Sequence, residues 1–440
     1  MQKKTSSTMF ANLFADSPVS SALTFLGLIV YKLLLDISYV TILYPMYSYS
    51  GFELSYSAVT VLLGFLMSIC VFICLPKRFE TVSDFVLTGI ALIAVVPYTT
   101  FYAFGGGDLV FTAMTFGFFI LVLAFVRLTP VLKMPAPGTR VADSVIGVLL
   151  WASAFYTITY CVMKFSLMSF SLTTADIYAR RAAFNSSGMS TLSSYIFSWA
   201  GSTIFPCSAA YFFHRRKYIN VILAVLASLF IFAVSGLKSL LFGIIMVFAI
   251  YFLFQVKEKM RLTVFLIVAA IVFCMLCFTL FDEIMPYSLV VRRLGILPAR
   301  IANQHYEFFR DSGPIHLSNS IFSSIVNYPF DKDPADIIGS LFYIDGETHA
   351  NTGIFADGYT NFGYFGALLW AAIFALLMKL QDAVSAGKPY PVVCGCFALY
   401  ITIFTNSALF TCMMTHGFIL TLIMVALIPK KEKGGESVYG

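Results

Sequence analysis

The feature that most constrains this chain is the repetition of apolar runs, each about 20 residues long, along its whole length. A bilayer offers no water to backbone N–H and C=O groups, so a spanning segment must satisfy them internally, as an α-helix does. A transmembrane β-strand would alternate polar and apolar side chains, whereas these runs are continuous. Only 11% of the residues are charged, which is too few to cover a soluble protein of 440 residues. The runs therefore predict an all-α polytopic membrane protein.

Twelve runs are long enough to be transmembrane helices, and we expect them to form a single transmembrane domain over residues 1–440. The first run is too long for the apolar core of a signal peptide, so we expect it to be an uncleaved first helix. The predicted helices cover residues 19–43, 55–75, 85–103, 109–128, 144–168, 192–212, 218–235, 239–256, 262–281, 353–378, 391–408 and 411–428.

The basic residues predict the orientation of these helices, because cytoplasmic connections are enriched in Lys and Arg. Placing the N-terminus in the cytoplasm puts most of the 28 basic residues in cytoplasmic segments. An even number of helices then returns the C-terminus, which is also basic, to the cytoplasm. Two external connections are long, at residues 169–191 and 282–352. The net charge of +6 is spread in small clusters between the runs, which does not indicate nucleic-acid binding.

External basic residues are the exception in this topology, and nearly all of them lie in the two long loops. Arginine presents a planar, permanently charged fork that suits phosphate and carboxylate. The set therefore indicates a binding site for an anionic headgroup, although each arginine could instead pair with carboxylates of its own loop. The candidates in the long loops are Arg180, Arg181, Arg292, Arg293 and Arg300.

Lys238 is a further candidate for the anion site. It lies in a Ser- and Gly-containing turn, residues 235–239, between two apolar runs that barely span a bilayer. Free backbone N–H groups beside a lysine can bind phosphate. The alternative is a plain helical hairpin whose lysine extends to the membrane surface.

Candidate acid–base residues lie where the longer loop returns to the membrane. A neutral imidazole at His349 could act as a general base toward a sugar hydroxyl, although a histidine in a hydrated loop more often only contacts its neighbours. Glu347 and Asp357 are the carboxylate alternatives. The histidines are widely spaced and match no metal-ligand pattern, so we expect neither a metal nor a cofactor.

One pair of charges lies inside the first apolar run. Lys32 and Asp36 are four residues apart and share one helix face. Because isolated charges are costly in a membrane, we expect them to neutralise one another. Carriers also use such pairs, so this pair is the main indication of a transporter.

The chain resembles the bacterial O-antigen (oligosaccharide repeat-unit) polymerases, which are related to the O-antigen ligases. The resemblance covers most of the length and depends on the order and spacing of several segments. These are residues 176–182 followed by Tyr195, Trp199 and Pro206, the turn 235–239, the long loop, and the glycine-bearing motif 353–366.

The resemblance implies a GT-C-like enzyme of the bacterial inner membrane that needs neither metal nor cofactor. Such polymerases transfer a growing glycan from undecaprenyl pyrophosphate to another lipid-linked repeat unit, with inversion, at the periplasmic face. The two long loops would then be periplasmic. By position, Arg180 or Arg181, and Arg292, Arg293 or Arg300, match the family's arginines near the pyrophosphate. The resemblance also implies a partner protein that regulates chain length. The alternatives are an O-antigen ligase acting on lipid A core and a lipid-linked oligosaccharide flippase.

Overall fold

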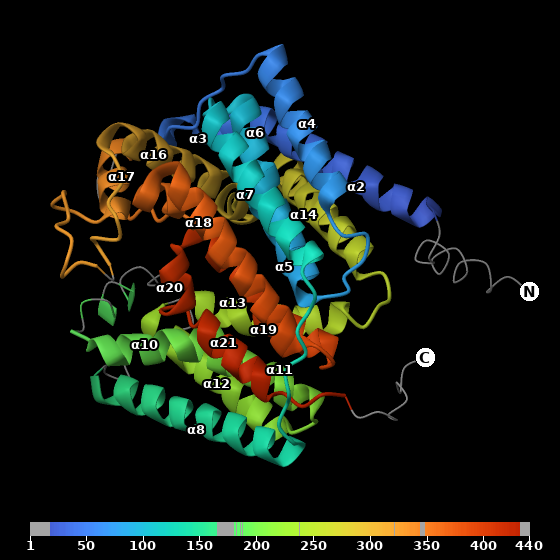
Figure 1. Ribbon diagram of the computed structural model, residues 1–440, viewed down its shortest axis with the longest axis vertical. Coiled ribbons are helices and arrows are strands. Elements are labelled where there is room, and N and C mark those ends of the chain that lie inside the picture. Colours follow the sequence, from blue (N-terminus) through green and yellow to red (C-terminus); the bar gives the residue numbers. More distant parts are fainter. Residues whose placement is uncertain are drawn as a thin grey trace, which may run out of the picture.

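The computed structural model describes residues 18–164, 180–181, 183–184, 186, 188–236, 238–320, 322–343 and 348–431 (Figure 1). Within these residues every regular element is a helix, which confirms the all-α prediction. Pairing of the β type is limited there to a single bridge between Ser55 and Gly105.

The helices follow the order of the predicted apolar runs. Their bounds are α2 Pro18–Ser38, η1 Tyr39–Leu43, α3 Tyr44–Tyr47, η2 Ser48–Ser50, α4 Ala58–Cys74, α5 Val82–Ile90, η3 Ala91–Val95, α6 Val96–Phe104, α7 Leu109–Leu128, α8 Thr139–Lys164, α10 Thr191–Trp199, η5 Ala200–Ile204, α11 Phe205–His214, α12 Tyr218–Ser235, α13 Lys238–Leu253, α14 Lys259–Phe281, α15 Met285–Tyr287, η6 Ser288–Ile296, α16 Leu297–Ser312, α17 Pro334–Phe342, α18 Ile354–Ser385, α19 Tyr390–Asn406, α20 Leu409–Met413 and α21 Phe418–Leu427.

Eight helical segments in the described residues are long and apolar enough to cross a membrane, as expected of a polytopic membrane protein. Three shorter apolar helices coincide with further predicted runs. The predicted run 192–212 is also helical, as α10, η5 and α11, but it is not among these apolar segments. The eight are Ser21–Ser50, Val82–Phe104, Leu109–Leu128, Thr139–Lys164, Tyr218–Ser235, Lys259–Phe281, Ile354–Ser385 and Leu409–Leu427, and the three are Ala58–Cys74, Leu241–Leu253 and Tyr390–Asn406.

The helices pack in two groups that α18 and α19 connect (Figure 1). In the first group α2 packs against α14 and α6, and α4 packs against α6. In the second group α11 packs against α12 and α13, and α12 against α8. Helix α18 contacts α7 of the first group, while α19 contacts α5 on one side and α13 on the other. One continuous apolar core therefore joins both groups.

Proline explains where the helices widen. Four π-helical segments, η1, η3, η5 and η6, each end two residues before a proline. A proline inside a helix has no N–H to donate, and its ring clashes with the carbonyl four residues earlier. A widened turn before the proline moves that carbonyl aside and lets the chain remain helical. The four prolines are Pro45, Pro97, Pro206 and Pro298.

The predicted long loop is largely helical in its described part. Helices α15, η6, α16 and α17 follow α14, and α16 packs on α18 and α6 (Figure 1). They cover the end of the first helix group that the topology predicts to be external, hereafter the external end. Most of the other long loop, residues 169–191, lies outside the described residues.

The glycine-bearing motif is a break in a helix. Helix α18 is interrupted at Phe362 and Gly363, where Gly363 has a φ of +61°, a conformation that glycine adopts without steric cost. A side chain at Gly366 would overlap the carbonyl of Gly358, so the two parts of α18 touch backbone to backbone. The motif therefore permits a close approach between the two parts of one helix.

Candidate functional site

Two of the predicted arginines contact the same segment, residues 47–52, at the external end of α2. The chain there turns through α3 and η2 to Gly51 and Phe52, and η6 and α16 pack over this turn. Arg292 donates from Nε and Nη2 to Ser288 Oγ, at 3.1 and 2.8 Å. Its guanidinium lies 4.3 Å from the centre of the Tyr47 ring, a distance at which cation–π attraction holds it in place.

Arg300 is held by the same turn and is almost completely buried. Its Nη1 donates to the carbonyl of Ser50 at 2.5 Å, and only 6% of the residue is exposed. The guanidinium lies 4.9 Å from the Phe52 ring centre and 5.3 Å from that of Tyr343 in the segment after α17. Burial lowers the pKa of Arg300 below its ordinary value, so its charged form is poorly solvated.

Among the described residues neither arginine forms an ion pair with a carboxylate, although the Glu53 carboxylate is near enough to Arg300 to act against the lowering of its pKa. Their contacts are a hydroxyl, a backbone carbonyl and three aromatic rings. Arg310, on the same helix as Arg300, differs because it pairs with Asp108 at 3.6 Å and Asp311 at 3.2 Å. A buried cation without a counter-ion is costly, and an anionic ligand would offset that cost. Arg292 and Arg300 therefore form the strongest candidate anion site, hereafter the arginine pair.

An apolar cavity of about 170 Å³ lies beneath η6, the element that carries Arg292 and Arg293. Helices α2 and α14 form two of its walls, and η3 with Pro97 forms a third. Its lining is apolar except for the hydroxyl of Tyr31, which donates to the carbonyl of Leu92.

The remaining predicted anion-binding residues lie apart from the arginine pair. Arg293 is exposed on η6. Arg180 is buried and Arg181 exposed, in a short helical segment whose Phe184 packs on Phe197 of α10, in the second helix group. Lys238 begins α13, and its side chain lies outside the described residues. Arg292 and Arg300 thus contact the same segment after α2, and no described contact joins Arg180 or Arg181 to them.

His349 has a partner that the sequence analysis missed. Its Nδ1 donates to the carboxylate of Asp336 at 2.6 Å, and the two side chains are 54% and 45% exposed. A carboxylate at Nδ1 fixes the tautomer that leaves Nε2 free to accept a proton. Asp336 lies in the first turn of α17 and Tyr343 directly follows this helix, so about 10 Å of helix axis separates their backbones. Glu347 lies outside the described residues.

His305 connects the two parts of this site. It lies on α16, five residues beyond Arg300, and its Nε2 donates to the carbonyl of Ala350 at 2.9 Å. Burial lowers the pKa of His305 to about 4, so the ring is neutral at physiological pH. This bond ties α16 to the segment that carries His349.

Asp357 is buried, and its carboxylate is occupied by the fold. It accepts hydrogen bonds from Trp370 Nε1 at 2.6 Å, Leu409 N at 2.8 Å and Asn361 Nδ2 at 3.0 Å. These bonds join the two parts of α18 to the start of α20. The geometry favours a structural role for Asp357 over the acid–base role predicted for it.

We expect Asp357→Ala to destabilise the protein by about 3 kcal/mol, because it leaves the indole N–H and a backbone N–H buried without an acceptor. Asp357→Asn retains one carbonyl acceptor, so it should lower the free energy of unfolding by less than Asp357→Ala does. Thermal unfolding of the detergent-solubilised protein, followed by tryptophan fluorescence, measures both, with the exposed Asp311→Ala as control. Wild-type stability of Asp357→Ala would contradict the structural role.

Gly51 shapes the pocket of Arg300. Its φ is +84°, and a Cβ there would overlap Nη2 of Arg300. We expect Gly51→Ala to cost the strain of a left-handed residue, about 1–2 kcal/mol, plus the displacement of the guanidinium. Gly106→Ala is the matched control, since Gly106 has a φ of +73° but its nearest neighbour lies 3.8 Å from an added Cβ. If Gly51→Ala and Gly106→Ala lower the midpoint of thermal unfolding equally, the added methyl group at position 51 does not displace Arg300.

Among the described residues, no group of three or more His, Cys, Asp or Glu side chains is placed to hold a metal ion. The site therefore consists of the arginine pair, the rings of Tyr47, Phe52 and Tyr343, and the His349–Asp336 pair. Comparison of the chain with family models, with curated proteins and with solved structures found no match.

Proposed function

We propose that this protein is an O-antigen polymerase, which joins undecaprenyl-pyrophosphate-linked oligosaccharide repeat units at the periplasmic face of the bacterial inner membrane. The observation that carries the proposal is the arginine pair, which forms no ion pair among the described residues and lies beside an apolar cavity between α2 and α14. A polyprenyl pyrophosphate has the matching parts, a strongly charged headgroup and an apolar chain. The reaction would be an inverting glycosyl transfer in lipopolysaccharide O-antigen biosynthesis.

The arginine pair would stabilise the leaving group. As the bond between the anomeric carbon and the pyrophosphate oxygen breaks, negative charge grows on that oxygen. Fixed cations stabilise this charge more in the transition state than in the ground state, which lowers the barrier without a metal. Arg300 suits this role because aromatic rings and a backbone carbonyl hold its guanidinium in position before substrate binds.

His349 would activate the acceptor sugar. Its Nε2 takes the proton of the acceptor hydroxyl as that oxygen bonds to the anomeric carbon from the side opposite the pyrophosphate. Asp336, at Nδ1, stabilises the resulting imidazolium. Arg180, Arg181, Arg293 and Lys238 stay candidates for binding the second lipid-linked substrate, and Glu347 stays an alternative base. A chain-length regulator is the expected protein partner.

A deletion strain tests the proposal through its lipopolysaccharide gel. Loss of a polymerase leaves core capped by one repeat unit. Bare core together with free lipid-linked polymer would identify an O-antigen ligase instead. Absence of both surface polymer and capped core would indicate a flippase. Either of these last two results contradicts the proposal.

A further inference from the structure

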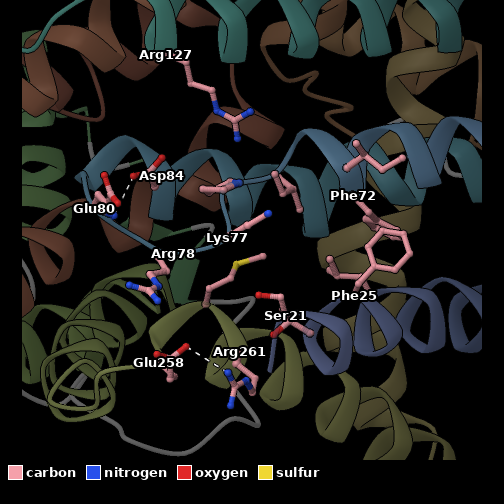
Figure 2. Close-up of a pocket in the computed structure, with 16 residues that line it drawn as sticks. Ser21, Phe25, Phe72, Lys77, Arg78, Glu80, Asp84, Arg127, Glu258 and Arg261 are labelled. Atoms are coloured by element: carbon pink, nitrogen blue, oxygen red, sulfur yellow. Dashed lines mark hydrogen bonds and ion pairs between the residues drawn. The ribbon is translucent and has the colours of Figure 1, made fainter. Parts of the chain in front are cut away.

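A larger cavity lies at the opposite end of α2 from the arginine pair (Figure 2). Its volume is about 860 Å³, and it lies between α2, α4 and α14, with the α4–α5 connection and the end of α7 as further walls. The topology predicts this end to be cytoplasmic. Four basic and three acidic side chains line one part of the cavity, and apolar side chains of α2 and α4 line another.

Two of the basic side chains have no ion-pair partner in the described part of the chain. Arg261 is paired with Glu258 at 3.3 Å. Asp84 caps α5 by accepting from the backbone N–H groups of Glu80 and Thr81. Arg78 has an interaction of its own. Lys77 and Arg127 remain, and both extend toward the middle of the cavity in Figure 2. They come from different elements, the α4–α5 connection and α7, so the fold brings two cations to one space.

The apolar part of the cavity belongs to membrane helices. Phe25 of α2 and Phe72 of α4 lie together, away from the charged side chains (Figure 2). Ile73, which also lines the cavity, is 68% exposed on α4, as expected of a side chain that faces lipid. The cavity thus has a charged part at the predicted membrane surface and an apolar part at the level of the acyl chains.

We propose that this cavity binds the headgroup of an anionic phospholipid, with the phosphodiester between Lys77 and Arg127 and the start of an acyl chain against Phe25 and Phe72. Basic pockets between transmembrane helices on the cytoplasmic side suit such headgroups, since each nearby Lys or Arg contributes to binding a negative lipid. The carboxylate of Glu80 favours a phosphodiester, with one negative charge, over a doubly charged phosphate monoester. A bound lipid would bridge α2, α4, α7 and α14.

The test uses the purified full-length protein and three probes: phosphatidylglycerol, phosphatidylethanolamine and soluble glycerol phosphate. Native mass spectrometry measures retention, and the midpoint of thermal unfolding measures stabilisation. Phosphatidylglycerol should be retained in preference to the other two. Lys77→Ala/Arg127→Ala should weaken that retention about thirtyfold, from the contribution expected of two surface cations. Both side chains are exposed, so the variant should fold.

Lys133→Ala/Arg140→Ala is the matched control, because it removes two exposed cations outside the cavity, one from the connection between α7 and α8 and one from the first turn of α8. The control should retain phosphatidylglycerol as the wild type does. If both double variants weaken the retention of phosphatidylglycerol equally, or if neither weakens it, the proposed site is wrong. Equal retention of phosphatidylethanolamine would overturn the preference for an anionic lipid, and equal stabilisation by glycerol phosphate would show a soluble phosphate ligand instead. If Lys77→Ala/Arg127→Ala does not fold, Lys77→Gln and Arg127→Gln separately provide the same comparison.

Discussion

Replacing Arg300 or Arg292 with alanine is expected to abolish polymer longer than one repeat unit at normal protein level. Each guanidinium would stabilise the departing pyrophosphate, and removal of one fixed donor of this kind typically lowers turnover by about 10²–10³. Arg300→Lys should restore little activity, because an ammonium cannot reproduce the planar fork between Ser50, Phe52 and Tyr343. The measurement is the lipopolysaccharide ladder of a deletion strain that expresses each variant.

Arg310→Ala provides the control for this experiment. Arg310 lies on α16 like Arg300, but it pairs with Asp108 and Asp311, so its charge is already compensated. We expect a full ladder from this variant. Arg292 is only partly buried, so its variant tests the role of the arginine pair even if Arg300→Ala lowers the protein level. Full ladders from both Arg292→Ala and Arg300→Ala would refute the pyrophosphate site.

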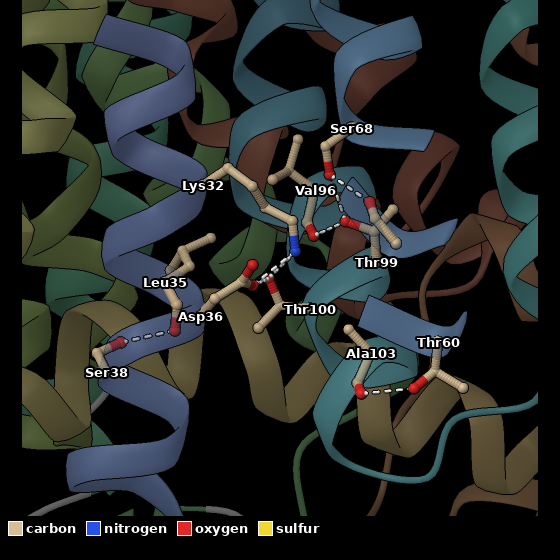
Figure 3. Close-up of polar contacts among 11 residues, drawn as sticks. Lys32, Leu35, Asp36, Ser38, Thr60, Ser68, Val96, Thr99, Thr100 and Ala103 are labelled. Carbon is tan, nitrogen blue, oxygen red and sulfur yellow. Dashed lines mark hydrogen bonds and ion pairs between the residues drawn. The ribbon is translucent and has the colours of Figure 1, made fainter. Parts of the chain in front are cut away.

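Lys32→Met is expected to destabilise the protein more than Asp357→Ala or Gly51→Ala. Lys32 Nζ lies 2.6 Å from Asp36 Oδ1, which confirms that the two residues pair, and Thr100 bonds to both (Figure 3). The Lys32 side chain is fully buried. Removing one member of a buried pair costs about 3–5 kcal/mol, because the other charge stays buried and uncompensated.

The double variant Lys32→Met/Asp36→Leu separates the cost of an unpaired charge from the value of the pair. It removes both charges, so we expect it to be more stable than Lys32→Met alone. Lys217→Ala is the surface control, since Lys217 pairs with Asp143 while 44% exposed and such pairs contribute at most about 1 kcal/mol. Unfolding midpoints in detergent measure all three. If Lys32→Met/Asp36→Leu is as unstable as Lys32→Met, the loss of stability comes from losing the ion pair and not from leaving the Asp36 carboxylate unpaired.

Part of the candidate site was visible in the sequence. Arg292 and Arg300 stood out because arginine is scarce on the side that the topology predicts to be external. His349 stood out because it ends a polar segment just before an apolar run. Asp336 did not, because it lies 13 residues before His349 and only the folding of α17 brings them to 2.6 Å. Gly51 and Tyr343 also could not be recognised from the sequence. Each lies against Arg300 only after segments distant along the chain have packed together.

The sequence by itself determined the helical class and the order of the helices, because a bilayer leaves a continuous apolar run no other way to satisfy its backbone. It also determined the Lys32–Asp36 pair, because residues four apart on one helix face meet in any packing. Only the tertiary structure decided which arginines contact the segment after α2, that Asp357 joins α18 to α20, and that Lys77 and Arg127 line one cavity. These contacts lie between segments distant along the chain, and they depend on how the faces of whole helices pack, which no local pattern specifies.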